Sequence, residues 1–254
     1  MDETTGSRDE GTTEAVDHGT IRAVDDELTA LTTAFRDLLA IVTELDEQAS
    51  WRPTGCTGWS VRDLLLHLLG DAQRALVALA GASDGTQGTP EHGLPDRDAV
   101  TYWSDFPASA PDPQSRQIRA IRTIAATWRF DGLVDAYVET AQAVLALAAR
   151  TPSSQLITTQ GHVLRVADLL ATIAFEAAVH HLDLVVDLDR PGPGAVPLTL
   201  VRRTLDGLLG IPAPPAWDDA AWARIGTGRQ PPTSAERAEL AALGADPDRL
   251  PLLG

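Results

Sequence analysis

The chain has 254 residues, 44% of them hydrophobic, which suits one domain or one domain with a smaller appendage. Its formal net charge of −16 disfavours nonspecific binding to a nucleic-acid phosphate backbone. The single cysteine, Cys56, excludes an intrachain disulfide and fits a reducing compartment. We expect neither a membrane-spanning run nor a signal peptide, so a soluble, cytoplasmic protein is the simplest interpretation.

The first part of the chain predicts a tail and two helices. Residues 1–20 are polar and acidic without periodicity, which predicts a disordered tail. Apolar residues then recur at alternating steps of four and three from Val24 to Leu45, as in a long amphipathic helix. After the segment ASWRPTGCTGWS, with its Pro and Gly, a second helix is expected from Ser60 to about Gly81. Ser60 is a good N-cap, and an aspartate follows it three positions later.

Residues 82–114 form a loop that is too long to be a mere connector. Loops of this length in compact domains are usually functional or disordered. The aromatic residues Tyr102, Trp103 and Phe106 indicate that part of the loop packs against the protein, as a lid would.

Two further helical regions complete the pattern. One covers residues 117–150 with a break near residues 130–132, and the run VADLLATIAFEAAVHHLDLVVDL predicts another that ends before DRPGPG. Between them, QLITTQGHVLRV predicts an extended loop or a short hairpin. Four long amphipathic helices predict a mainly α protein with a four-helix bundle in residues 21–190. Short helical patterns around IPAPPAW predict a small C-terminal α or α+β domain in residues 191–254.

Polar residues interrupt the apolar faces of two of these helices. Glu176 and His180 fall on the face marked by Ile173 and Leu184, and His67 of the second helix also points toward the bundle interior. A buried carboxylate is costly unless something pairs with it. Residues four apart are neighbours on a helix, so one metal ion can bind both, and a histidine from a facing helix completes a His2Glu set with one open position.

On spacing alone, an internal Glu–His hydrogen bond or a satisfied core histidine remains an alternative to this metal site. The sequence contains no HExxH motif, so a zincin protease is disfavoured. It also lacks the ExxH pairs of carboxylate-bridged bundles, which disfavours a di-iron centre.

Two segments carry a family resemblance. GWSVRDLLLHLLG with the preceding PTGC, and FEAAVHHLDL, resemble the helix-two and helix-four signatures of the DinB-like metal-binding superfamily, in the branch named for mycothiol-dependent maleylpyruvate isomerase. The C-terminal ARIGTGRQPPTSAERAEL and DRLPLLG are similar to ends common in actinobacterial members. This resemblance spans residues 21–254. It implies a DinB-like four-helix bundle in which His67, Glu176 and His180 bind a divalent metal ion, with zinc the expected ion.

The resemblance also implies mycothiol as the thiol cosubstrate. The family's characterised activity adds the mycothiol thiolate to a cis-alkene, allows rotation about the resulting single bond, and eliminates the thiol to leave the trans isomer. Zinc lowers the pKa of a coordinated thiol, so the thiolate exists at neutral pH. We therefore expect an enzyme that adds a thiolate to a small electrophile, with cis–trans isomerisation and thiol S-transfer both open. The expected partners are small molecules, not nucleic acid or membrane, and the protein is a monomer or a homodimer.

Two other functions remain open. One is a non-catalytic, metal-stabilised bundle with a ligand-binding or regulatory role, in which a residue such as His162 supplies a fourth ligand. The other is a metal-dependent hydrolase, because zinc lowers the pKa of its bound water to about 7.

Residues around the expected metal receive more specific roles. Asp183 either orients a ligating imidazole or faces solvent at the helix end. Arg74 either binds a substrate carboxylate or pairs with Asp71. For Arg229, in GTGRQPP, the family resemblance implies a role in reaching an anionic substrate or cofactor, because the family's isomerase uses an arginine from its C-terminal domain. Trp103 is the candidate wall of the binding pocket.

The remaining unusual residues are expected to be structural. Cys56 is assigned a structural role, because the implied chemistry takes its thiolate from mycothiol. His181 points away from His180 around the helix and is expected at the surface or in helix packing. Three tryptophans at helix ends and in loops are expected to plug the core: Trp51, Trp59 and Trp128.

Overall fold

The computed structural model describes residues 18–83, 93–106 and 116–253. Its first helix, α1 (His18–Val42), begins before residue 20, so the expected tail is shorter than predicted at its C-terminal end. The rest of that tail, residues 1–17, lies outside the described residues.

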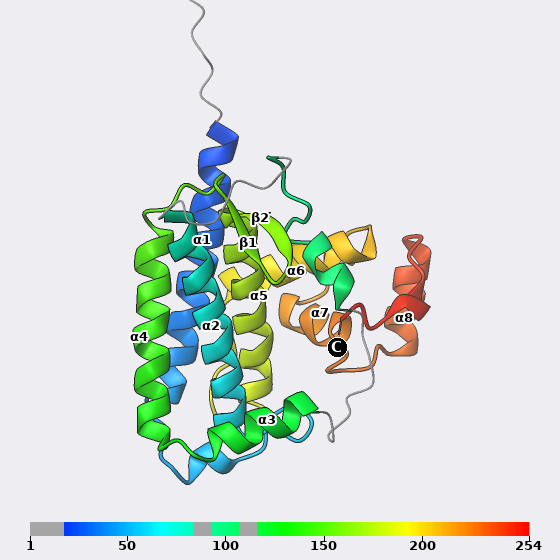
Figure 1. Ribbon diagram of the computed structural model, residues 1–254. Coiled ribbons are helices and arrows are strands. Elements are labelled where there is room, and N and C mark those ends of the chain that lie inside the picture. Colours follow the sequence, from blue (N-terminus) through cyan, green and yellow to red (C-terminus); the bar gives the residue numbers. More distant parts are fainter. Residues whose placement is uncertain (1–17, 84–92, 107–115, 254) are drawn as a thin grey trace, which may run out of the picture.

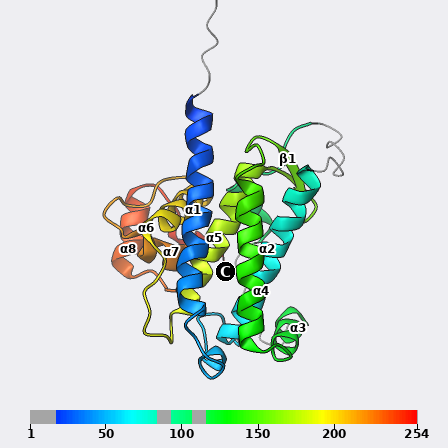
Figure 2. The same ribbon diagram turned by 90° about the vertical axis from the view of Figure 1, so that its left-hand side faces the viewer.

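Four long helices form a bundle, as predicted (Figure 1). The helix α1 packs mainly against α5 (Val166–Leu184), and α2 (Val61–Ser83) packs mainly against α4 (Phe130–Ala148). A further contact between α2 and α5 places the polar faces of these two helices opposite each other. Figure 2 shows the bundle turned by 90°. Four residues of the predicted apolar stripe of α1 are buried in it: Leu31, Phe35, Leu38 and Val42.

The helix α2 begins where the sequence predicts. The backbone N–H and the hydroxyl of Ser60 both donate to the Asp63 carboxylate, at 2.8 and 2.7 Å. The stretch Val61–Ala82 is long and apolar enough to cross a membrane by length and composition, so the expectation that no run reaches this length is wrong. The same stretch packs against α4 and α5, and core helices of soluble proteins pass the same test.

The predicted break in the third helical region is present. It separates α3 (Arg116–Ala125) from α4, which starts at the buried Phe130. Ahead of α5, β1 (Leu156–Thr159) and β2 (His162–Arg165) form an antiparallel hairpin, one of the two expected conformations. Its two-residue turn, Gln160–Gly161, has positive φ at both positions, as tight hairpins with the native twist require.

Part of the long loop packs against the bundle, as expected. The 3₁₀ helix η2 (Thr101–Asp105) carries Tyr102 and Trp103, and both side chains are buried. Residues 84–92 and 107–115 of this loop lie outside the described residues, so its role as a lid stays a prediction.

The C-terminal part is helical. It contains α6 (Ala195–Leu209), α7 (Asp219–Gly226), α8 (Ser234–Ala242) and the 3₁₀ helix η3 (Pro247–Arg249), and residues 185–253 include no strand. The helix α6 packs against α1, α5 and α7, and the chain end returns to α7 where the Leu252 N–H donates to the Gly226 carbonyl at 2.8 Å. The division into two domains near residue 190 stays a prediction.

Two tryptophans do not plug the core. Trp51 is 51% exposed and Trp128 is 37% exposed, so this prediction is wrong for both. Both tryptophans contact Arg62, a fully buried residue of α2. The Arg62 guanidinium lies 4.1 Å from the centre of the Trp51 ring and donates to the Trp128 carbonyl at 3.1 Å. The Trp51 ring therefore covers a cation, a use of the indole face that the hydrophobicity of tryptophan does not reveal. Trp128 contacts the same cation through its main-chain carbonyl. The 3₁₀ helix η1 (Ala49–Trp51) carries the Trp51 ring.

Candidate metal centre

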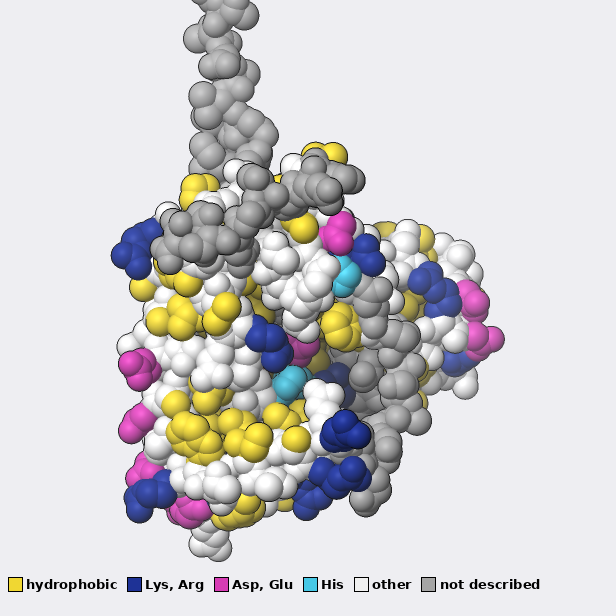
Figure 3. All heavy atoms as spheres, viewed as in Figure 1, with side chains coloured by type: hydrophobic (Ala, Val, Ile, Leu, Met, Phe, Trp, Pro, Cys, Tyr) yellow, Lys and Arg dark blue, Asp and Glu magenta, His cyan; other side chains and the backbone are white. Residues whose placement is uncertain are grey.

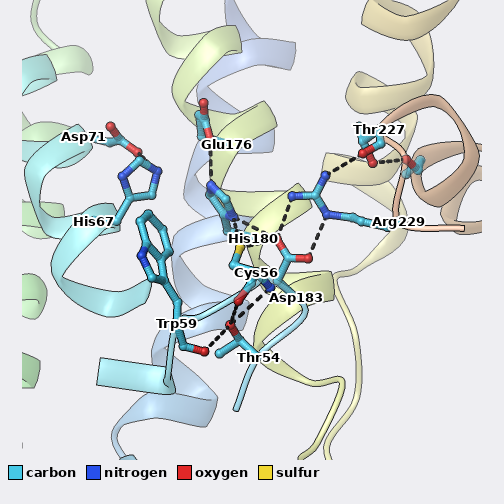
Figure 4. Close-up of polar contacts among 11 residues, drawn as sticks. Thr54, Cys56, Trp59, His67, Asp71, Glu176, His180, Asp183, Thr227 and Arg229 are labelled. Atoms are coloured by element: carbon cyan, nitrogen blue, oxygen red, sulfur yellow. Dashed lines mark hydrogen bonds and ion pairs between the residues drawn. The ribbon is translucent and has the colours of Figure 1, made fainter. Parts of the chain in front are cut away.

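His67 of α2 and Glu176 and His180 of α5 converge inside the bundle (Figure 4). Each offers one ligand atom, and these three atoms all lie within 4.8 Å of one another. Glu176 Oε2 is 3.1 Å from His180 Nε2, and the two imidazole rings are perpendicular with their centres 4.9 Å apart. The helical spacing of four and the packing of α2 on α5 thus bring together the three predicted ligands.

The surroundings keep His67 in the form that binds metals. Burial, together with the charge of His180, lowers the pKa of His67 to about 4. The imidazole is therefore neutral at pH 7, and a neutral imidazole has the lone pair that a metal ion needs.

Glu176 and His180 form an ion pair when no cation is present. Burial acts to raise the pKa of Glu176, but the hydrogen bond and charge of His180 outweigh it and lower that pKa. For His180, burial acts to lower the pKa, and Cys56, Asp183 and Glu176 outweigh it, so the pKa stands well above its ordinary value. A divalent cation could take the place of this proton, because it would neutralise the carboxylate and bind both imidazoles.

The donor set fits a divalent metal ion. Two imidazole nitrogens and one carboxylate oxygen are the ligands of many catalytic zinc sites, with bonds of about 2.0–2.2 Å. Ligand atoms around a tetrahedral ion of this size are about 3.4 Å apart. The 3.1 Å between Glu176 Oε2 and His180 Nε2 is close to that separation, and the ligand atoms of the trio (His67, Glu176 and His180) all lie within 4.8 Å of one another.

A second group of ligand atoms shares His180. Atoms of Cys56, His180 and Asp183 also lie within 4.8 Å of one another. Arg229 disfavours a metal there, because its guanidinium donates to both Asp183 oxygens, at 2.8 and 2.6 Å. The Arg229 guanidinium is already paired with the Asp183 carboxylate, and it would repel a metal ion placed beside it. Of the two groups, the one with Glu176 is therefore the better candidate for a metal ion.

Asp183 fixes the orientation of His180. It is 1% exposed, so the alternative of a solvent-facing residue at the helix end is wrong. Asp183 Oδ2 lies 2.9 Å from His180 Nδ1. Burial acts to raise the pKa of Asp183, but His180 and Arg229 outweigh it and hold that pKa well below its ordinary value. The carboxylate thus accepts the Nδ1 proton, and Nε2 faces Glu176 as a ligand must.

Arg74 forms an ion pair with an aspartate, which is one of the two roles predicted for it. Its partner is Asp71, whose other oxygen lies 3.3 Å from His67 Nε2. The Arg74 side chain remains 48% exposed, so it is also accessible at the edge of the site.

A cavity of about 410 Å³ lies against the trio. Trp103 and Phe175 form an aromatic wall, with ring centres 4.6 Å apart, and Tyr102 and Phe106 continue it. Arg74 and Arg229 contribute cationic groups to the same cavity. Figure 3 shows a histidine side chain in a hollow of the molecular surface, with arginines around it.

Comparison with known proteins identifies the family of this chain. The family model of the mycothiol maleylpyruvate isomerase N-terminal domain matches residues 31–185, more than half of the chain. The chain belongs to this family. The matched range contains His67, Glu176 and His180, and it ends one residue after α5.

Two solved structures share the fold of this family member. They are a crystal structure of the mycothiol-dependent maleylpyruvate isomerase and one of a histidine-to-alanine mutant of it. Each is 16% identical, has a TM-score of 0.57, and covers 82% of this chain and 90% of its own. They confirm the predicted mainly α, DinB-like bundle with a small C-terminal part. No curated protein matches the chain.

Cys56, which was expected to be structural, is a neighbour of the candidate centre. Its Sγ lies 3.1 Å from Asp183 Oδ2 and 3.6 Å from His180 Nδ1. The signal in the sequence that could have indicated this position is PTGC itself, since it is part of the segment that resembles the family.

Two other histidines of this family member are not part of the trio. His162 lies 3.3 Å from Asp96, and neither group of ligand atoms in the described part of the chain includes it. The idea of His162 as a fourth ligand is therefore not supported. His181 is buried and its Nε2 lies 3.1 Å from the Pro191 carbonyl, which confirms a packing role.

Proposed function

We propose that this protein is a mycothiol-dependent metalloenzyme that activates a thiol for addition to a small electrophile. The observation that carries the proposal is the convergence of His67, Glu176 and His180 beside a cavity, in a chain of the mycothiol maleylpyruvate isomerase N-terminal family. The solved structure with the same fold is named as a mycothiol-dependent isomerase, which supports the same class of chemistry.

Zinc is the metal we propose, because two imidazoles and a carboxylate are typical of its catalytic sites. When bound, it supplies a positive charge that lowers the pKa of a coordinated thiol, so that the thiolate exists at neutral pH. The chain's own part is to hold the three ligands in place. Asp183 keeps the Nδ1 proton on His180, which leaves Nε2 as the donor atom.

The cavity offers groups for a small anionic or polar electrophile. Arg74 at the edge and Arg229 within the cavity are proposed to attract and orient a carboxylate of the substrate. Arg229 already donates to Asp183 through Nε and Nη2 and to the Thr227 carbonyl through Nη1, so two of its five N–H groups remain for a substrate. Trp103 is proposed to form the apolar wall against which the thiol or the electrophile packs.

Neither alternative function gains support from the site. A closed structural metal site requires a fourth protein ligand, and the groups found among the described residues have three members each. A hydrolase requires a carboxylate or histidine that is free to act as a base. The nearest candidates, Asp71 and Asp183, are both paired with arginines.

We expect metal-dependent turnover when the zinc-loaded protein is given mycothiol and a panel of electrophiles. The panel includes cis-alkene dicarboxylates for isomerisation and epoxides and alkyl halides for S-transfer. Removal of the metal by a chelator should abolish turnover, and added zinc should restore it. Conversion of the alkene without loss of thiol indicates an isomerase, whereas a thioether product indicates S-transfer. Stoichiometric zinc without turnover for any thiol and electrophile would contradict the proposal.

A further inference from the structure

A single loop contacts both imidazoles of the candidate centre. Residues 53–59, the positioning loop, connect η1 to the start of α2. The Trp59 ring lies 5.1 Å from the His67 ring, centre to centre, and Cys56 Sγ lies 3.6 Å from His180 Nδ1. Figure 4 shows Cys56 and Trp59 below the two imidazoles, with Asp71 and Glu176 above them. The loop thus supports the histidines from the side opposite Glu176.

Internal hydrogen bonds close this loop into a turn. The Thr54 side chain accepts from the Cys56 N–H at 3.2 Å and donates to the Trp59 carbonyl at 3.0 Å. The Thr54 N–H donates to the same carbonyl at 3.1 Å. Cys56 and Trp59 are therefore held at a fixed distance from each other.

The loop is also attached to the end of α5 through Gly55. The Gly55 N–H donates to the Asp183 carbonyl at 2.9 Å. A Cβ atom on Gly55 would lie 2.6 Å from Asp183 Oδ1, closer than real Cβ contacts come, and a tight 3.1 Å from Asp183 Cα. The backbone at this position comes so near to Asp183 that only glycine fits.

Cys56 completes the hydrogen bonding of the same carboxylate. Asp183 Oδ2 accepts from the Cys56 thiol at 3.1 Å and from Arg229 Nη2 at 2.6 Å, and it lies 2.9 Å from His180 Nδ1. A buried polar group that has all its partners in place specifies one conformation. The position of Asp183, and through it that of His180, therefore depends on the positioning loop.

We infer that Gly55 and Cys56 are positioning residues of the metal centre. They hold Asp183 against His180, so that Nε2 of this imidazole points at the site shared with His67 and Glu176. This inference rests on the proposed function, because it assumes that the trio binds a metal ion. It assigns a role in metal binding to two residues that supply none of its ligands.

The test uses Gly55→Ala, with Gly132→Ala as the matched control. A Cβ atom on Gly132, in the first turn of α4, would meet nothing closer than 4.0 Å. Metal-free proteins are titrated with cobalt(II) ions, and the affinity and the visible absorption spectrum of the bound ion are recorded. We expect Gly55→Ala to weaken cobalt binding by about 10–100-fold, as loss of an outer partner of a ligand does, and to change the spectrum. Gly132→Ala should match the wild type in both.

Two substitutions of Cys56 separate positioning from a merely structural role. Cys56→Ala removes the donor to Asp183 without adding an atom, so it should weaken cobalt binding and alter the spectrum of the folded protein. Cys56→Ser keeps a donor and should lie closer to the wild type. This pair decides the question if Gly55→Ala does not fold.

Wild-type affinity and spectrum in the folded Gly55→Ala and Cys56→Ala proteins would overturn the inference, even with a lower melting temperature. A wild-type protein that binds no cobalt would instead overturn the proposed function, and the inference with it.

Discussion

Replacing His67 or Glu176 by alanine is expected to release the metal ion and abolish thiol-dependent turnover, while the bundle stays folded. Each variant removes one of three ligands from the trio. Loss of an outer partner of a ligand already costs about 10–100-fold in metal affinity, so loss of a ligand should cost more than that. Folding is retained because the core of the bundle is built from apolar residues of four long helices. Metal content by elemental analysis and helicity by circular dichroism measure the two effects.

His162→Ala is the matched control for these variants. His162 lies beside Asp96 and belongs to neither group of ligand atoms in the described residues, so its variant should keep one metal ion per chain. Stoichiometric metal in His67→Ala or Glu176→Ala would show that the ligands are assigned wrongly.

Asp183→Asn is expected to destabilise the protein and to weaken metal binding. The side chains of Asp183 and Arg229 are 2% and 20% exposed, so the substitution leaves a largely buried guanidinium without its counter-ion. Removal of one partner from such a pair costs about 3–5 kcal/mol. His180 also loses its carboxylate partner, which should lower metal affinity by about 10–100-fold. Denaturant unfolding of the metal-free protein and zinc competition with a chelator measure these effects separately.

Asp187→Asn provides the comparison at an exposed ion pair. Asp187 pairs with Arg52, and the two side chains are 45% and 48% exposed. The free energy of unfolding should change by no more than about 1 kcal/mol, as for other surface pairs. Equal unfolding free energies for the two variants would contradict the role assigned to Asp183.

The features that follow from local periodicity were predictable from the sequence. Glu176 and His180 share a face because they are four residues apart on one helix, and His67 interrupts the apolar face of another. Opposed polar positions in a bundle have to meet, since neither can pack against apolar side chains without cost. Periodicity therefore predicted the bundle and the inward-facing positions of these three side chains, and the family resemblance favoured a metal site over an internal Glu–His hydrogen bond.

Contacts made by irregular backbone were not predictable in this way. Cys56 and Asp183 are 127 positions apart, and their contact depends on the path of the positioning loop. No repeat in the sequence encodes that path. The exposed ring of Trp51 was missed for a related reason, because its partner is the guanidinium of Arg62 and not an apolar core.

The ion pair between Asp183 and Arg229 was not predictable from the sequence either. Each residue was placed near the metal by its own signal, Asp183 by helical spacing and Arg229 by the family resemblance. Their hydrogen bonds to each other join α5 to the segment after α7, and this packing is set by the whole C-terminal part. This ion pair disfavours a metal ion in the group with Cys56 and leaves the group of His67, Glu176 and His180 free to bind one.

X-ray absorption at the zinc edge tests the trio most directly. For the zinc-loaded protein without thiol, we expect a shell of nitrogen and oxygen atoms at about 2.0–2.2 Å that includes two imidazoles. Added mycothiol should introduce one sulfur atom at about 2.3 Å. Sulfur in the shell before any thiol is added, and absent in Cys56→Ala, would place the ion in the group with Cys56 and contradict the assignment to His67, Glu176 and His180.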